Sequence, residues 1–173
     1  MYTVKEHLKP TNLNGISQKQ IDDHWKLYEG YVNQVNNLTD RYRFSFEYNG
    51  MVLHEYYFEN LNATPLPQGL LQDLITKTWG SVKKWEDDFI STGKTRGIGW
   101  AILYVDPNTK TLLNLFTPSH DIGHIAGFKP LLVMDCWEHA YMIDHHSGGR
   151  ADYINAFIQN INWHVVVKRL NTA

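Results

Sequence analysis

Three histidines and one aspartate are the side chains of this sequence with the clearest chemical potential. His24 and His54 lie in the first third of the chain, while Asp135 and His139 lie close together near its end. Three neutral imidazoles and a carboxylate offer nitrogen and oxygen ligands that suit iron or manganese and leave room for a bound solvent molecule. If the four side chains converge in the fold, the sequence predicts a redox-metal site.

Each of these side chains also has an ordinary structural interpretation. A histidine on a helix flank is often hydrogen-bonded within the fold, and a buried aspartate is stabilised equally by an arginine or a helix cap. A zinc site is another interpretation, because there are other closely spaced histidines, namely His120 with His124 and His145 with His146. However, His54 lacks the second histidine of a His-Glu-x-x-His motif, and Cys136 has no partner thiol. Spacing alone therefore indicates only a candidate metalloprotein.

Helical patterns in the first half would position His24 and His54. Ser17 and Gln20 predict a capping box, and apolar residues then recur at helical spacing to about Leu38. After a polar and aromatic link from Arg41 to Tyr48, a second helix is expected from Asn49 through Leu61. A short connection would pack these two helices antiparallel. Two more helices are expected, one from Gln68 to Trp79 and one capped by Ser81.

The second half combines strand and helix patterns. Trp100 to Val105 and Thr111 to Phe116 predict a hairpin, and Leu131 to Asp135 is an apolar run typical of a buried strand. Helical periodicity returns from Asp152 to Leu170. We therefore expect an α+β protein: an N-terminal antiparallel helical hairpin domain (residues 1–80), then a mixed α/β C-terminal domain (residues 81–173) with a three-stranded antiparallel sheet.

Composition limits the remaining possibilities. The chain has 173 residues, of which 43% are hydrophobic, and a net charge of -2. This charge argues against a general nucleic-acid or anionic-membrane binder. With a single cysteine, Cys136, no internal disulfide is possible, which fits a reducing compartment. The first residues carry no apolar signal segment, and no apolar run approaches transmembrane length, so a cytoplasmic protein is expected.

The run Asp135-Cys136-Trp137-Glu138-His139-Ala140-Tyr141 resembles the iron/manganese superoxide dismutase family. Further matches, in the order of the family, span most of the chain: His24 with Tyr31-Val32, His54 with Phe58-x-Asn60-Leu61, Gly97-x-Gly99-Trp100, Arg150-x-Asp152-Tyr153, and Asn162-Trp163. The run at residues 135–141 is highly specific, whereas the helical pieces are moderately so.

The resemblance implies a metal-dependent oxidoreductase. Its expected activity is the disproportionation of superoxide to dioxygen and hydrogen peroxide at one iron or manganese ion per chain. The implied ligands are His24, His54, Asp135 and His139, with a water or hydroxide as the fifth. The ion would alternate between its 3+ and 2+ states. Whether it is iron or manganese is left open.

The resemblance also implies roles around the metal. Tyr31 corresponds to the gateway tyrosine of the family, although Tyr28 competes because the spacing from His24 is one residue shorter than in common members. Trp100 and Trp137 correspond to an aromatic wall.

Family members place a glutamine, or in some a histidine, against the bound solvent. The helical-domain position for that glutamine is Gly50 here, so this role falls to His120 on the C-terminal side. A group that hydrogen-bonds to the solvent or ligands of a metal ion tunes the chemistry of that ion. Arg150, and less specifically Lys26, would give the entrance the positive potential that attracts an anionic substrate.

Glu138 corresponds to the glutamate that bridges to the ligand histidine of a second subunit, which implies a homodimer with Glu138 and His139 at the interface. A different class of function stays open: a non-catalytic structural or assembly subunit of the same fold. Such relatives are expected to lose ligands, and all four ligand positions are filled here.

Overall fold

Helix α1 (Gln18–Asn37) begins where the sequence predicts. In the computed structural model, which describes residues 1–173, the Ser17 hydroxyl accepts a hydrogen bond from the Gln20 backbone N–H at 3.1 Å. One face of the helix is buried, and it carries the predicted apolar stripe: Ile21, Trp25, Tyr28, Val32 and Val35. The helix therefore follows the apolar periodicity of its sequence.

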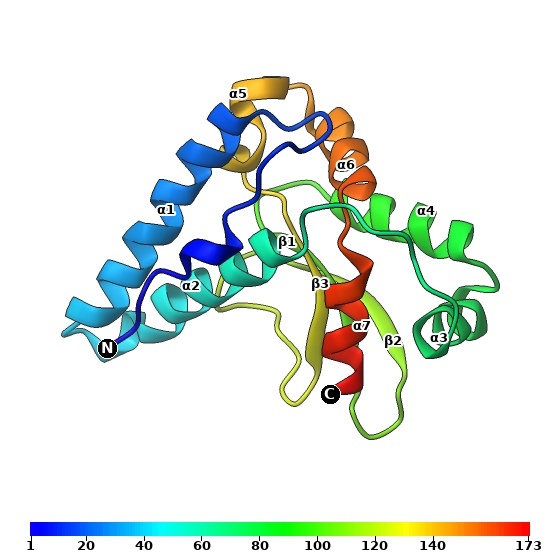
Figure 1. Cartoon of the computed structure of the whole chain (residues 1–173). Helices are drawn as coiled ribbons and strands as arrows, with labels where there is room; N and C mark the ends of the chain where they lie inside the picture. Colours follow the sequence, from blue (N-terminus) through cyan, green and yellow to red (C-terminus); the bar gives the residue numbers. More distant parts are fainter.

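Helix α2 (Phe44–Glu59) begins five residues earlier than Asn49, so the predicted link over residues 41–48 is wrong. A short 3-10 helix, η2 (Arg41–Arg43), precedes it, because the Asp40 carboxylate accepts the Tyr42 backbone N–H at 2.9 Å. An ion pair of 2.6 Å between Arg43 and Glu47 spans the first turn. Helices α1 and α2 pack side by side at the N-terminal end of the molecule (Figure 1).

Two short helices follow as expected. Helix α3 (Leu70–Trp79) ends at Gly80, whose φ of 87° lies in the left-handed region that glycine adopts at low cost. Helix α4 (Val82–Gly93) then starts at Ser81, whose hydroxyl accepts the Lys84 backbone N–H at 3.1 Å.

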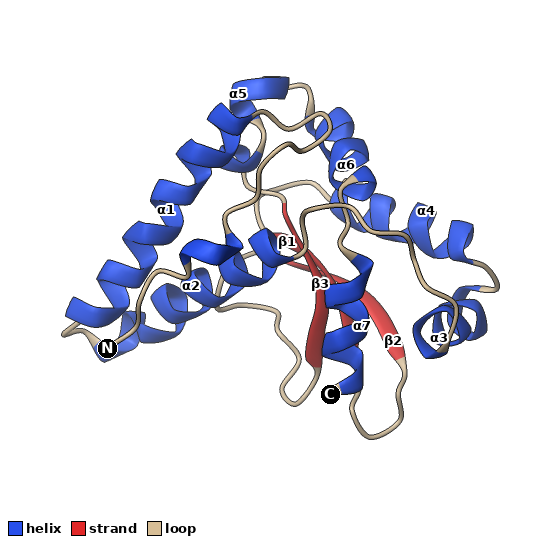
Figure 2. Cartoon of the chain, viewed as in Figure 1, coloured by secondary structure: helices blue, strands red, loops and turns tan.

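The sheet has three antiparallel strands in the order β2-β1-β3. They are β1 (Trp100–Val105), β2 (Leu112–Thr117) and β3 (Lys129–Asp135). Central strand β1 is buried along its whole length. Figure 2 shows the sheet between the α1–α2 pair on one side and α3 with α4 on the other. The predicted α+β fold with a three-stranded antiparallel sheet is confirmed.

The C-terminal tail is broken into two helices, α6 (Arg150–Gln159) and α7 (Trp163–Asn171), so the single helix predicted from Asp152 to Leu170 is wrong. The reason is a long-range contact: the Asn162 backbone N–H donates to the Asn60 carbonyl at 2.6 Å, and Leu61 bridges Ile161. Shorter elements complete the chain: η1 (Glu6–Leu8), η3 (Glu138–Ala140) and α5 (Met142–His145). No helix combines the length and the apolar character needed to cross a membrane.

Candidate metal centre

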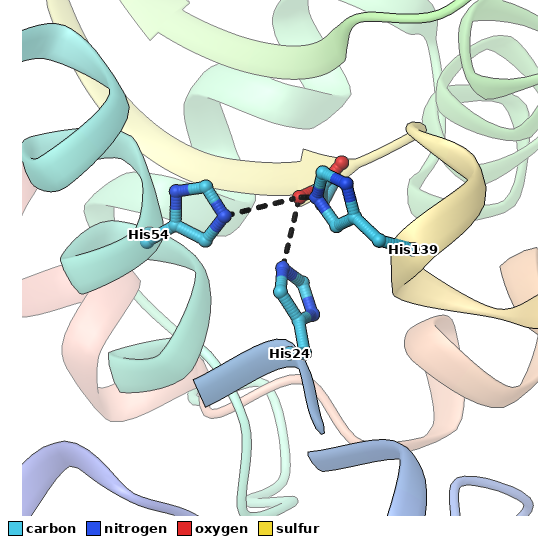
Figure 3. Close-up of side chains that lie close together, drawn as sticks. His24, His54 and His139 are labelled. Atoms are coloured by element: carbon cyan, nitrogen blue, oxygen red, sulfur yellow. Dashed lines mark hydrogen bonds and ion pairs between the residues drawn. The ribbon is translucent and has the colours of Figure 1, made fainter. Parts of the chain in front are cut away.

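Four elements bring the predicted ligands to one point. His24 comes from α1, His54 from α2, Asp135 from the end of β3, and His139 from η3. Their ligand atoms all lie within 4.8 Å of one another. In Figure 3 the rings of His24, His54 and His139 point toward one another. Oδ2 of Asp135 is 3.0 Å from Nε2 of His24 and 3.0 Å from Nε2 of His139. The His54 Nε2 lies 3.7 Å from the same oxygen.

Hydrogen bonds around the cluster fix the direction of its donor atoms. The His54 Nδ1–H donates to the Gly50 carbonyl at 2.6 Å, which turns the lone pair of Nε2 toward the cluster. The Trp137 backbone N–H donates to Oδ1 of Asp135 at 2.8 Å and leaves Oδ2 facing the histidines. The His54 Nε2 is buried and has no hydrogen-bond partner.

An unpartnered buried nitrogen is costly unless a cation or donor satisfies it. Together with an N₃O donor set of suitable spacing, it shows that these residues fit an iron or manganese ion. His24, His54 and Asp135 are fully buried, whereas the His139 side chain is 22% exposed. The cluster therefore reaches the surface on the side of η3.

Protonation of the cluster suits metal binding. Burial alone would raise the pKa of Asp135, but the neighbouring His139 and His24 hold it well below its usual range. Burial lowers the pKa of both His24 and His54. Burial also acts to lower the pKa of His139, but Asp135 more than offsets this and raises it. A cation would displace the proton that Asp135 otherwise attracts to His139.

Four of the predicted surrounding side chains gather beside the four clustered residues. The Tyr31 hydroxyl lies 2.8 Å from Nε2 of His120, and the Trp100 indole N–H donates to Nδ1 of His120 at 3.0 Å. The Trp137 ring stacks on His120 with 5.1 Å between ring centroids. His120 itself is fully buried.

These contacts determine where the hydrogen atoms lie. An indole nitrogen can only donate, so Nδ1 of His120 must accept from Trp100. Burial lowers the pKa of His120 to about 4, so its ring is neutral and carries its one proton on Nε2. That N–H donates to the Tyr31 oxygen, which leaves the Tyr31 hydroxyl hydrogen free for another acceptor.

The geometry separates the two candidate tyrosines. The Tyr28 hydroxyl donates to Glu55 at 3.0 Å and accepts the Lys5 backbone N–H at 3.0 Å, so it does not contact His120. Gly50 explains how Tyr31 and His120 can meet. A Cβ at this position would lie 2.7 Å from Cδ1 of Tyr31 and 3.2 Å from Cδ2 of His120.

Arg150 lies apart from this group. Its Nη1 donates to the Gly97 carbonyl at 2.5 Å, while Nε and Nη2 are buried without a hydrogen-bond partner. No hydrogen bond or ion pair joins Arg150 to the four clustered residues. Lys26 has a side chain 72% exposed and lies 3.8 Å from Asp23.

Two features escaped the sequence analysis. A capping box was predicted at Ser17 and Gln20, but the Gln20 side chain does not complete it. Instead, this side chain donates to the His139 carbonyl at 2.6 Å and accepts the Ile143 backbone N–H at 3.0 Å. The sequence offered one signal for this role: Gln20 is a polar residue on the apolar face of α1, one turn before His24. His124 does not join His120 in a metal pair, since its Nε2 faces the His120 backbone carbonyl at 2.7 Å.

Comparison with known proteins agrees with this geometry. The family model described as iron/manganese superoxide dismutases, C-terminal domain, matches residues 67–169. The chain belongs to the iron/manganese superoxide dismutase family. It is 34% identical over 195 residues to the superoxide dismutase [Fe] of Aquifex aeolicus, covering 98% of this chain and 91% of the relative.

Other family relatives differ in the metal that they are named for. The superoxide dismutase [Fe] of Pyrobaculum aerophilum is 32% identical, covering 87% of this chain and 81% of the relative. The superoxide dismutase [Mn/Fe] of Aeropyrum pernix is 37% identical, covering 75% of this chain and 63% of the relative.

Proposed function

We propose that this protein is a superoxide dismutase, with His24, His54, Asp135 and His139 as the ligands of one iron or manganese ion. The observation that carries the proposal is the convergence of three Nε2 atoms on one carboxylate oxygen in a chain of this family. When bound, the ion supplies a one-electron couple through which two superoxide anions and two protons become dioxygen and hydrogen peroxide.

We propose four tasks for the residues around the ion. The ligands hold the ion, with the His54 ring fixed by Gly50 and the Asp135 carboxylate fixed by the Trp137 backbone. Trp100 and Trp137 wall the site and restrict the entry of bulk water, which strengthens electrostatic interactions inside.

Tyr31 and His120 together hold a hydroxyl proton, that of Tyr31, next to the metal site. Because His120 donates to the Tyr31 oxygen, the Tyr31 hydroxyl can donate in turn to solvent or substrate in the site. Burial raises the pKa of Tyr31 to about 12, so that proton stays in place at neutral pH. We assign Arg150 to the entrance, where the unpartnered Nε and Nη2 support a role for its positive charge.

We further propose a homodimer with Glu138 and His139 at its interface. The support is that Glu138 is exposed beside the one ligand of the four that is not fully buried. Sedimentation velocity tests this: the Glu138→Ala variant is expected to shift toward monomer, and a wild-type monomer would contradict it.

We also propose that the chain divides into two domains at residue 80 and that the protein is cytoplasmic. Two ligands come from each side of that division, and Cys136 is buried as a free thiol. Cell fractionation tests the location.

The decisive experiment is purification without added metal, followed by elemental analysis and an assay of superoxide consumption. We expect iron or manganese near one ion per chain, with activity proportional to that content. Reconstitution of the metal-free chain with each metal separately then identifies the active one. Zinc as the bound metal, or a fully loaded protein without activity, would overturn the proposed function.

A further inference from the structure

The loop that carries His120 has almost no backbone support. Between Pro118 and Phe128, which we call the His120 loop, one backbone hydrogen bond is present, from the Phe128 N–H to the Ile125 carbonyl at 3.2 Å. This segment contains neither helix nor strand. Yet His120 is fully buried and meets both Tyr31 and Trp100 at hydrogen-bond distance. Something other than backbone pairing must therefore hold the loop against the sheet.

His124 makes that connection from within the loop. Its Nε2 lies 2.7 Å from the His120 carbonyl oxygen, and its Nδ1 lies 2.6 Å from the Tyr104 hydroxyl. A carbonyl oxygen can only accept, so Nε2 of His124 must carry a proton. In the neutral ring, Nδ1 then accepts from the Tyr104 hydroxyl. Each polar atom in the series Tyr104, His124 and the His120 carbonyl has its partner.

Tyr104 is a rigid anchor for this series. It lies in central strand β1, is 2% exposed, and follows the register shift between Leu103 and Tyr104. The extra residue at this shift is Leu131 of β3, and β1 keeps an unbroken register with β2 through Tyr104. Apart from the bonds of the His120 ring itself to Tyr31 and Trp100, the remaining side-chain bond of the loop joins the Ser119 hydroxyl to Asp121 at 2.8 Å, and it is local and does not reach the sheet.

We propose that Tyr104 and His124 are positioning residues for the reaction: they hold the His120 loop so that the His120 ring stays between Trp100 and Tyr31. The inference rests on the proposed function, because that function gives the His120 ring a part in tuning the metal. One ring face and both ring nitrogens of His120 are already engaged. A displacement of its backbone would therefore misalign its bond to Tyr31.

The test compares Tyr104→Phe and His124→Ala with the wild type as metal-loaded, full-length proteins. Hydrogen–deuterium exchange followed by mass spectrometry reports on the amides of residues 118–128. The reduction potential of the bound ion and the activity per bound metal report on the site. We expect loop exchange about tenfold faster in each variant, as the loss of one hydrogen bond implies. We also expect a shifted potential, activity per metal reduced about tenfold, and unchanged metal content.

Two further variants make the result specific. His124→Gln should restore much of the wild-type behaviour, because its amide can donate to the His120 carbonyl and accept from Tyr104. Ser119→Ala removes the local bond of the same loop and should match the wild type. The double variant of Tyr104→Phe with His124→Ala should be no worse than either single variant, since both break one series.

Faster exchange with wild-type potential and activity per metal would show a structural role only and overturn the proposal. Wild-type exchange in both variants would also overturn it. If the wild type itself proves inactive, the proposed function fails, whereas the exchange measurements still decide whether the pair holds the loop.

Discussion

The four clustered residues and His120 occupy one site but are supported in different ways. His24 and His54 lie within long helices, Asp135 ends a strand that pairs with β1, and His139 lies in the short helix η3. His120 lies in a loop that side-chain bonds connect to the sheet. Backbone hydrogen bonds thus hold the elements that carry His24, His54 and Asp135, while a few side-chain bonds hold the loop of the group that is expected to adjust the chemistry of the metal. Substitutions in the two groups should therefore differ in effect. A substitution among the four clustered residues should lose the metal, whereas one around His120 should keep it.

The largest effect is expected from His139→Ala. This change removes one of four converging donors and leaves the buried Asp135 carboxylate with one fewer partner. Elemental analysis should show iron or manganese content reduced at least about tenfold, equivalent to a loss of about 1.4 kcal/mol or more in binding. His164→Ala, a change on helix α7 outside the cluster, is the control and should keep wild-type content. Normal occupancy in His139→Ala would refute the ligand assignment.

A smaller effect, on activity instead of metal content, is expected from Gly50→Ala. The added Cβ would lie 2.7 Å from the Tyr31 ring, so Tyr31 or His120 must move. We expect full metal content with activity per metal reduced about tenfold, which corresponds to the loss of about one hydrogen bond. Gly30→Ala on helix α1 is the matched control, because it is the same substitution in a helix and nothing lies within 4 Å of the added Cβ. That control should gain about 1 kcal/mol of stability and keep its activity. Equal activity in both variants would contradict the steric argument.

The smallest change is expected from Tyr31→Phe, which keeps the ring and removes only the hydroxyl bonded to His120. Metal content and melting temperature should stay near wild type, while activity per metal falls severalfold because the proton donor of the site is lost. Steady-state superoxide assays across pH measure this. Tyr28→Phe loses bonds to Lys5 and Glu55 instead and should leave the rate unchanged. A rate loss confined to Tyr28→Phe would show that Tyr28 is the gateway residue.

The sequence predicted features that depend on neighbouring residues. The start of α1 followed from Ser17 and the apolar stripe behind it, and the approach of Asp135 to His139 followed from a specific local run. The break in the C-terminal tail was not predictable in this way. It depends on Asn162 bonding to Asn60, about a hundred residues earlier in the chain.

The site shows the same limit. His120 and His124 have a spacing that suggested a metal pair, because spacing does not reveal the direction of each ring. In the structure one ring faces Tyr31 and the other faces Tyr104 and a carbonyl. The early start of α2 was missed for a related reason: α2 follows directly on η2, and the role of Asp40 as the cap of η2 depends on its side-chain conformation.

The side-chain amide of Gln20 fixes the position of α1 relative to the segment that carries His139. It bonds at once to the His139 carbonyl and the Ile143 N–H, one helical turn before His24 on α1. Sliding or rotating α1 would break both bonds. Gln20 thus sets the separation of His24 from His139 before any cation binds. The side chains of the cluster therefore lose less conformational entropy when a cation binds.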